Sequence, residues 1–549
     1  MYSSCQMYLG SFRGGRLTAS IKKLVFRLCC VLMITVAGFQ AQNARGSESG
    51  EKNMTADRVS ELAEGLQWFN VSRPLGEGEL RGRVVLIDFW TYCCINCMHV
   101  IPDLQYLERK FGDKLLVIGI HCGKFDAEKN GENIRQALLR YGIRHPVVND
   151  ADFKIWRALG IHAWPTLTLF APDGKFAATM SGEGHREELE EAIAKLLASC
   201  PARKLTALPL SPEAEKSESI GFSFPGKILA DGAKKRLFIA DSNHHRIIIA
   251  GQDGSLQAII GSGLPGHRDA SFKEAEFFKP QGLALIGNIL YVADTGNHLL
   301  RAIDLSVNRV STVAGTGVQG HLRRGAGPGL SIPLNSPWDL AVSPDARSIF
   351  VAMAGSHQIW RFEPDSGKIS WFAGDGGENL RDGSLLSALF AQPSGLCVQN
   401  NFLYVADSET SSVRQISLAE GKVKTLLGTG LFDFGDMDGS ASDARLQHPL
   451  GVAAGQGLHV ADSYNNKIKI IDLSSGKCRT LEIPGLKLSE PGGLSFLDGK
   501  LYVADTNSHR IVVIDPLTKT ASPFIIEKLT PPSKNADPML CPAPPPAGE

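Results

Sequence analysis

The fold is decided by residues 84–97, which read VVLIDFWTYCCINC. The first seven residues are apolar apart from Asp88 and are rich in β-branched and aromatic side chains, which predicts a buried central strand. A helix is expected to begin at Cys94, because an apolar face continues beyond it and Pro102 is placed where it would kink that helix. The predicted strand therefore ends directly at a cluster of cysteines, and such a cluster indicates metal or redox chemistry.

The spacing of Cys94 and Cys97 favours redox chemistry. At a helix N-terminus, free backbone N–H groups and the positive end of the helix dipole favour a thiolate over a thiol at Cys94. Cys97 lies one turn later on the same side, where it can resolve a mixed disulfide. The pair could be half of a zinc site, but no second Cys/His pair at a structural spacing follows, and His99 and His121 are weak partners. We therefore expect no metal and no organic cofactor, with the dithiol itself as the redox group.

This stretch resembles the active-site segment of the thioredoxin family, and the similarity extends over residues 65–198. Residues 163–170, AWPTLTLF, resemble the segment that carries the family's cis-proline. The resemblance implies that Pro165 lies against the cysteine pair and leaves the Trp164 backbone free to pair with a substrate strand. It also implies that Asp88 moves a proton to or from the resolving cysteine. An extra helix and strand within residues 132–148 are similar to the TlpA-like and peroxiredoxin-like branch.

Several positions keep a second interpretation. Asp88 could be a satisfied core polar group, although beside the cysteines a titrating role is favoured. Cys93 replaces the family's aromatic residue and is either a third redox thiol or, as we favour, a packing residue, because adjacent cysteines bridge only with strain. Thr91 stands three residues before Cys94, the spacing of a peroxidatic site, which makes a thiol peroxidase an alternative. The role of Cys122 and the direction of electron flow stay open.

A repeat follows the first domain, and each copy opens on a proline and a short apolar strand. The six starts are Pro225, Pro280, Pro337, Pro393, Pro449 and Pro491. The starts are 42 to 57 residues apart, and each copy is predicted to contain four short strands. This pattern predicts an all-β propeller of six blades, since one blade cannot bury both of its faces alone. The second strand of each copy ends in Ala-Asp, except that Met353 replaces the aspartate in the third. The pattern resembles NHL repeats, and its aspartate is expected to cap a turn rather than to perform chemistry.

The predicted organisation is an α/β thioredoxin-like domain followed by an all-β six-bladed NHL-type propeller. Residues 1–44, basic and then apolar, predict a signal peptide or anchor, with a transit peptide as the third option, and hence an exported, periplasmic or extracytoplasmic protein. The remaining boundaries are a linker (45–64), the thioredoxin-like domain (65–200), a second linker (201–219), the propeller (220–527) and a proline-rich disordered tail (528–549).

The charge balance argues against nucleic acid, since 57 basic residues face 57 acidic ones and no excess positive charge exists to attract phosphates. Membrane contact is expected only if the leader is uncleaved. The predicted function is a thiol-disulfide oxidoreductase, with Cys94 as nucleophile, Cys97 as resolving thiol and a propeller that recruits or presents a protein partner. The rivals are a propeller scaffold with an idle dithiol, a thiol peroxidase, and a propeller metal site or lyase built on His298, His357 or His509.

Overall fold

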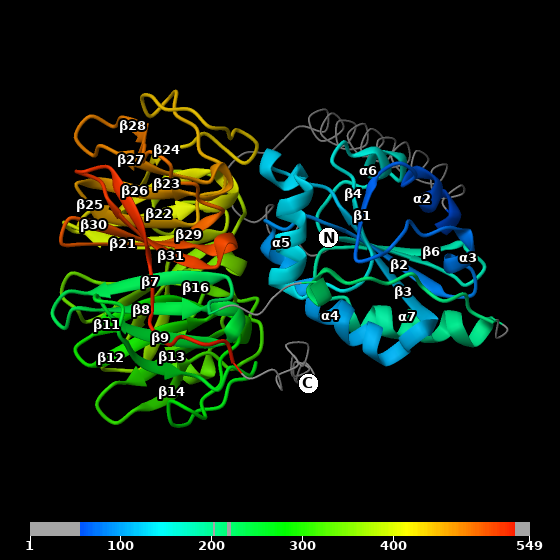
Figure 1. The fold of residues 1–549 in the computed structure, drawn as a ribbon, viewed down its shortest axis with the longest axis horizontal. Helices are drawn as coiled ribbons and strands as arrows, with labels where there is room; N and C mark the ends of the chain where they lie inside the picture. Colours follow the sequence, from blue (N-terminus) through cyan, green and yellow to red (C-terminus); the bar gives the residue numbers. More distant parts are fainter. Residues whose placement is uncertain (1–54, 201–203, 217–220, 533–549) are drawn as a thin grey trace, which may run out of the picture.

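The computed structural model describes residues 55–200, 204–216 and 221–532, and these form two domains that lie side by side (Figure 1). The N-terminal domain is an α/β sandwich and the second domain is a six-bladed propeller, as predicted. The predicted leader and the tail beyond residue 532 lie outside the described residues. Within the described ranges, no helix has the length and apolar character needed to cross a membrane.

The N-terminal domain is built on one mixed sheet of six strands in the order β1-β4-β3-β2-β5-β6. Its strands are β1 (Gln67–Phe69), β2 (Val84–Trp90), β3 (Leu115–His121), β4 (Val147–Asn149), β5 (Thr166–Phe170) and β6 (Phe176–Ser181). Its helices are α2 (Ala56–Leu62), α3 (Glu77–Leu80), α4 (Ile95–Phe111), α5 (Gly131–Tyr141), α6 (Lys154–Ala158) and α7 (Arg186–Ser199).

Strand β2 lies at the centre, parallel to β3 and antiparallel to β5, and all seven of its residues are buried. Because side chains alternate along a strand, Leu86 packs with α4 and α7, while Ile87 packs with α2 and α6 on the other face. Burial on both faces explains why the strand is a nearly continuous apolar run. The same packing fixes the direction in which the chain leaves β2 toward the cysteines.

The N-terminal domain begins earlier than predicted, so the linker predicted over residues 45–64 is wrong for its last part. Thr55 caps α2 by accepting a hydrogen bond from the Arg58 amide at 3.3 Å. Ala56 and Val59 are buried in the core against the sheet. The helix is short and mostly polar, and tertiary packing rather than local propensity makes it part of the domain.

The connection between the domains is also bound to the N-terminal domain over its described part. The backbones of Ser72 and Asn70 pair with Pro209 and Ser211 across 2.9 and 2.8 Å. The Asn70 side chain accepts a further hydrogen bond from the Glu213 amide at 2.9 Å. Residues 204–216 therefore extend this domain, where the sequence predicted a plain linker.

The propeller has six blades, each formed from one continuous segment of chain. The first three blades contain β7 (Pro225–Asp231), β8 (Arg236–Asp241), β9 (Arg246–Gly251), β10 (Leu256–Ile260), β11 (Pro280–Ile286), β12 (Ile289–Asp294), β13 (Leu299–Asp304), β14 (Arg309–Ala314), β15 (Ala326–Pro328), β16 (Pro337–Val342), β17 (Ile349–Met353), β18 (Gln358–Glu363) and β19 (Lys368–Ala373). The last three contain β20 (Gly383–Ser384), β21 (Pro393–Gln399), β22 (Phe402–Asp407), β23 (Ser412–Ser417), β24 (Lys422–Leu427), β25 (Gly451–Gly455), β26 (Gly457–Asp462), β27 (Lys467–Ile471), β28 (Cys478–Thr480), β29 (Pro491–Leu497), β30 (Lys500–Asp505), β31 (Arg510–Asp515) and β32 (Thr520–Phe524).

The repeat aspartate has a structural role, although its partners differ from a simple turn cap. In five blades its Oδ1 accepts a hydrogen bond from the backbone segment that enters the same blade, as Asp294 does from the Phe278 amide at 2.7 Å. In four blades its Oδ2 also pairs with an arginine of the third strand, such as Arg301 at 2.8 Å. The third blade, with Met353 in this place, keeps its strands and gains β15 at its outer edge.

Neighbouring blades are joined by a second repeated hydrogen bond. In each blade, a short turn joins the second strand to the third, and the side chain of the residue after this turn is a hydrogen-bond acceptor. The donor is the backbone amide of the residue that precedes the first strand of the next blade. These acceptors, called here the inter-blade acceptors, are His245, His298, His357, Ser411, Asn466 and His509. The last of them closes the ring, because His509 binds the amide of Phe224 at 3.1 Å. Residues 221–224 thus serve ring closure and add no strand to the last blade.

The propeller's packing continues past residue 527. Leu529 packs against the cluster between the first and last blades, and the Thr530 carbonyl accepts a hydrogen bond from Arg246 at 2.9 Å. The start of the predicted tail, residues 528–532, therefore lies on the propeller.

Candidate redox site

Cys94 stands at the N-terminus of α4, directly after the turn that follows β2. It is the N-cap residue with an extended backbone, and its carbonyl accepts the Met98 amide at 3.1 Å. Cys94 is partly exposed, whereas Cys97 is 1% exposed in the first turn of the helix. The two thiols therefore have the placement that a nucleophile and a resolving group require.

The Cys97 thiol lies in an environment that keeps it protonated. Burial, a hydrogen bond with Cys94 and the charge of Asp88 raise the pKa of Cys97 well above its usual value. A thiol of this kind needs a nearby base before it can attack a disulfide.

Asp88 is a buried carboxyl group that could serve as such a base, because its charge acts on Cys97. It is 2% exposed in the middle of the sheet, and among the described residues its Oδ1 has no hydrogen-bond partner. Burial raises the pKa of Asp88 to about 7, and the neighbouring His145 opposes this shift. A carboxyl group with this pKa can both accept and release a proton near neutrality.

Pro165 lies in the loop that leads into β5, and the Trp164–Pro165 peptide bond is cis. Trp164 and Cys94 pack against the same hydrophobic cluster, which contains Cys93 and Cys97. Ala163, which precedes Trp164 in the same loop, is exposed to solvent. The structure thus places Cys94 and Cys97 in one cluster with Trp164, the residue before Pro165. Asp88 lies near enough for its charge to act on Cys97.

Cys93 is fully buried beneath the start of α4, in agreement with the packing interpretation. Burial and the nearby carboxylates of Glu128 and Glu409 raise its pKa well above the usual value. Cys122 is also buried, and its thiol contacts the Asp150 carboxylate at 3.6 Å. Neither thiol has the partly exposed, helix-terminal setting of Cys94.

Thr91 is committed to a different partner from the one that a peroxidatic site requires. Its hydroxyl donates a hydrogen bond to the buried Glu128 carboxylate at 2.8 Å. The same carboxylate accepts the amides of Cys93 and Phe125, at 2.8 and 2.9 Å. Thr91 therefore holds the turn before α4: its carbonyl accepts the Cys94 amide at 3.4 Å, and its hydroxyl makes no hydrogen bond to the Cys94 thiol in the described structure.

The end of the N-terminal domain that carries Cys94 faces the propeller. On the propeller side, six residues contact the N-terminal domain, one immediately before the proline that opens each blade or its repeat. These six are called here the pre-proline residues. They are Phe224, Lys279, Ser336, Gln392, His448 and Glu490. All six have φ between 45° and 61°, a left-handed conformation that is uncommon for residues other than glycine. The inter-blade acceptors hold their backbones in this conformation and compensate for its cost.

Each pre-proline side chain contacts the N-terminal domain. Phe224 lies under the Arg140 guanidinium, and Lys279 donates to the Arg140 carbonyl at 3.1 Å. Ser336 lies 2.7 Å from His99 Nε2, and His448 packs against the Phe125 ring. These contacts make the ring of pre-proline residues the platform on which α4 and α5 sit.

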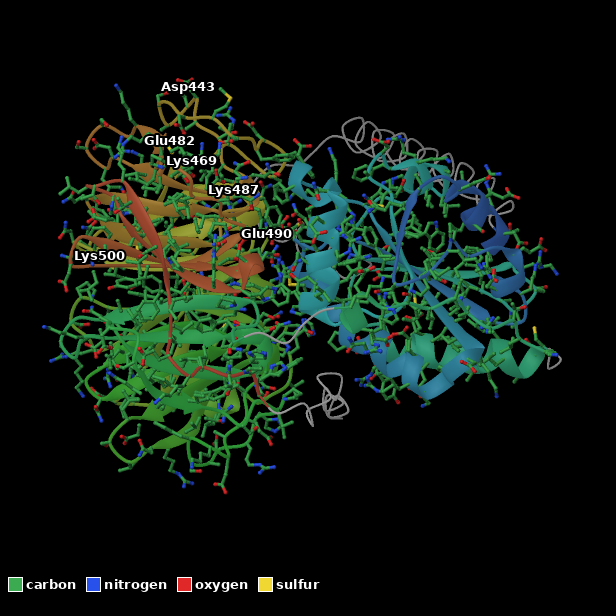
Figure 2. All side chains as sticks on the ribbon, in the orientation of Figure 1. Asp443, Lys469, Glu482, Lys487, Glu490 and Lys500 are labelled. Atoms are coloured by element: carbon green, nitrogen blue, oxygen red, sulfur yellow. The ribbon has the colours of Figure 1, made fainter. Side chains whose placement is uncertain are left out.

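The most buried part of this platform carries charge. Glu490 is 1% exposed and pairs with Arg140 of α5 at 2.5 Å, while its other oxygen accepts the Tyr92 hydroxyl at 3.2 Å. Figure 2 shows Glu490 on the side of the propeller that faces α5. Lys124 and Glu409 form a second buried ion pair at 2.5 Å. Pairs of this kind orient one domain on the other, because breaking either would leave a buried charge.

The platform was missed by sequence reasoning, which noted the repeat prolines and not the residue before them. One signal was available in the sequence: the position before the repeat proline holds a different residue type in each of the six copies, whereas the positions around it repeat. The three histidines considered as metal ligands are among the inter-blade acceptors. In each, Nδ1 accepts a backbone amide, so this ring nitrogen already has a structural partner.

Comparison with known proteins agrees with both parts of the fold. A family model described as thioredoxin-like matches residues 82–176, and one described as NHL repeat matches residues 390–416 and 488–514. The chain is 44% identical over 525 residues to NHL repeat-containing protein 2 of Bos taurus, covering 85% of this chain and 71% of that protein. It is 43% identical over 498 residues to the chloroplastic protein SUPPRESSOR OF QUENCHING 1 of Arabidopsis thaliana, covering 85% of this chain and 47% of that protein. Over 118 residues it is 29% identical to the thiol-disulfide oxidoreductase ResA of Bacillus thuringiensis, covering 22% of this chain and 66% of that protein.

Proposed function

The chain belongs to the family of NHL repeat-containing protein 2, and from that premise we propose that it is a thiol-disulfide oxidoreductase acting through Cys94 and Cys97. Support comes from a partly exposed Cys94 at a helix N-terminus that hydrogen-bonds the buried Cys97 thiol. Asp88, buried beside them with a pKa of about 7, can take the proton that Cys97 must lose. The similarity to a protein named thiol-disulfide oxidoreductase points the same way.

The proposed reaction has two exchange steps. The Cys94 thiolate attacks one sulfur of a partner disulfide, which forms a mixed disulfide and releases the partner's other sulfur as a thiolate. Cys97 then passes its proton to Asp88 and attacks the Cys94 sulfur, which releases the second partner thiolate and leaves a Cys94–Cys97 disulfide. Two electrons have moved to the partner, and the reverse sequence would oxidise a partner dithiol.

The partner is proposed to be a protein that reaches the dithiol along the Ala163–Pro165 loop, because Ala163 is exposed, whereas Gln392 of the platform covers the backbone on both sides of Cys94. The propeller surfaces away from the platform would recruit or present that protein. The basic and apolar pattern before residue 44 supports export to a compartment where disulfides persist.

Turnover of an insulin or model disulfide by the full chain tests the proposal. The Cys94→Ser variant should lose turnover by about a hundredfold or more, because it lacks the nucleophile. Cys97→Ala should accumulate a covalent adduct through Cys94, visible on a non-reducing gel. Cys200→Ser, a partly exposed thiol at the end of α7, is the matched control and should behave as the unmodified chain. Turnover that is the same in Cys94→Ser would favour a scaffold with an idle dithiol.

A further inference from the structure

Gln392 is the pre-proline residue of the fourth blade, and its backbone is held from two blades. Its amide donates to His357 of the third blade at 3.0 Å. Its carbonyl accepts the hydroxyls of Ser394 and Ser408, at 2.9 and 2.7 Å. The residue is 1% exposed. Its side chain is therefore presented to the N-terminal domain from a rigid base.

The Gln392 side-chain amide binds the backbone on both sides of Cys94. Its Oε1 accepts the Ile95 amide at 2.8 Å, and its Nε2 donates to the Cys93 carbonyl at 2.8 Å. The orientation of the amide is determined by these partners, since exchanging its oxygen and nitrogen would set donor against donor and acceptor against acceptor. One side chain of the propeller thus spans the nucleophile of the other domain.

The contact with Ile95 bears on the charge of Cys94. Ile95 is the first residue of α4, and its amide is one of the free donors that make a helix N-terminus positive. When Oε1 accepts this amide, the donor is engaged and the negative end of the Gln392 dipole is brought to the same helix end. Both effects oppose a thiolate at Cys94, whereas an unengaged amide would support it.

We propose that Gln392 is a positioning residue of the dithiol site, through which the propeller holds the turn at Cys94 and limits how readily its thiolate forms. This inference rests on the proposed function of the Cys94–Cys97 pair. It assigns to the propeller a part in setting the reactivity and reduction potential of a dithiol that lies in the other domain. In a dithiol couple, reduction takes up two electrons and two protons, and a more stable Cys94 thiolate favours the reduced form.

Two substitutions at this position should change the reactivity of Cys94 in opposite directions. Gln392→Leu frees the Ile95 amide, so alkylation of Cys94 by iodoacetamide at pH 6 should become about twofold to fivefold faster, as expected for one change at a helix terminus. Gln392→Glu brings a carboxylate to the same point, so the rate should fall by about fivefold or more through charge repulsion. The reduction potential, measured against glutathione mixtures, should rise in the first variant and fall in the second.

The measurement uses the reduced full chain, with labelling assigned to Cys94 by peptide mass spectrometry because Cys93 is its neighbour. Gln447→Leu is the matched control, since Gln447 also accepts a backbone amide across the interface, that of Ala127 at 2.9 Å. Equal shifts in Gln447→Leu and Gln392→Leu would overturn the inference, as would shifts of the same sign in Gln392→Leu and Gln392→Glu. Failure of the proposed function is distinguishable, because it would appear in the unmodified chain as a Cys94–Cys97 pair that forms no disulfide in oxidised glutathione.

Discussion

Buried aspartates are used in opposite ways by the two domains. In the propeller, Asp294 is fully buried and satisfied, because it accepts the Phe278 amide and pairs with Arg301, which is also fully buried. In the N-terminal domain, Asp88 is almost as deeply buried, yet its Oδ1 has no hydrogen-bond partner among the described residues. Burial is thus equal, and the surroundings differ.

The difference teaches how a structural carboxylate can be told from a reactive one. A buried charge can serve a structural role when its hydrogen bonds and ion pairs compensate for its desolvation. Burial raises the pKa of both aspartates, but of the two only Asp88 has a carboxyl oxygen without a hydrogen-bond partner among the described residues, which leaves that oxygen available to take up a proton. The same substitution, aspartate to asparagine, should therefore have opposite consequences at the two sites.

The largest loss of stability is expected in the propeller. Asp294→Asn removes the buried one of the two carboxylates that pair with Arg301 and leaves only the half-exposed Asp269, so the free energy of unfolding should fall by about 3 kcal/mol or more. Chemical denaturation of the full chain measures this loss, and the alkylation rate of Cys94 in the folded variant should not change. Asp443→Asn, on an exposed outer loop (Figure 2), serves as the control and should change stability by less than about 0.5 kcal/mol. An equally small loss in Asp294→Asn would contradict a structural role for this pair.

Asp88→Asn should show the reverse pattern. The folded-state pKa of Asp88 is about 7, above its usual value of 3.8, so ionisation of this group opposes folding increasingly as the pH rises from about 4 to above 7. The variant should be more stable than the unmodified chain by about 4 kcal/mol at pH 8, with little difference at pH 4. Release of the mixed disulfide should become roughly tenfold slower without the base.

Thermal melting at the two pH values and single-turnover kinetics separate the two roles of Asp88. A variant that melts much earlier at pH 8 and turns over normally would show that Asp88 is a structural hydrogen-bonding group.

The smallest effect concerns the inter-blade acceptors, where burial lowers the pKa of His245 to about 3. Below pH 6.5, the ordinary pKa of histidine, His245 is protonated in the unfolded chain and neutral in the folded chain. This histidine therefore reduces stability as the pH falls from about 6.5 toward 3. His245→Asn keeps a hydrogen-bond acceptor, as Asn466 does in the fifth blade. The substitution should be neutral at pH 8 and stabilising by about 2 kcal/mol at pH 5. The exposed His267, replaced in the same way, should leave this pH dependence unchanged.

Much of the fold could be predicted because its signals are local. The run at residues 84–97 contains both the buried strand and the helix start, and the structure has them as β2 and α4. The repeat prolines marked the six blades correctly, even in the third blade, where Met353 replaces the aspartate. The start of the N-terminal domain was missed, because α2 has a weak local pattern and depends on packing against the sheet.

The candidate site was predictable only on its own domain. The four predicted residues lie on segments whose sequence is distinctive: Cys94, Cys97, Asp88 and Pro165. The structure packs the cysteines with Trp164, which precedes Pro165, and brings the charge of Asp88 to bear on Cys97. Gln392 and Glu490 could not be assigned to this site, because they lie about three and four hundred residues further along the chain. A hydrogen bond between such distant positions leaves no periodic pattern in the sequence.

The sequence by itself determined the two architectures, the dithiol and the repeated backbone of the blades, since each depends on apolar periodicity and short-range turn chemistry. Only the tertiary structure decided what the six pre-proline positions do. The repeat places them in equivalent backbone conformations, yet they face a domain that has no sixfold symmetry. Each side chain is therefore matched to a different partner, and such matching is a property of the assembled surface that no single segment of the chain contains.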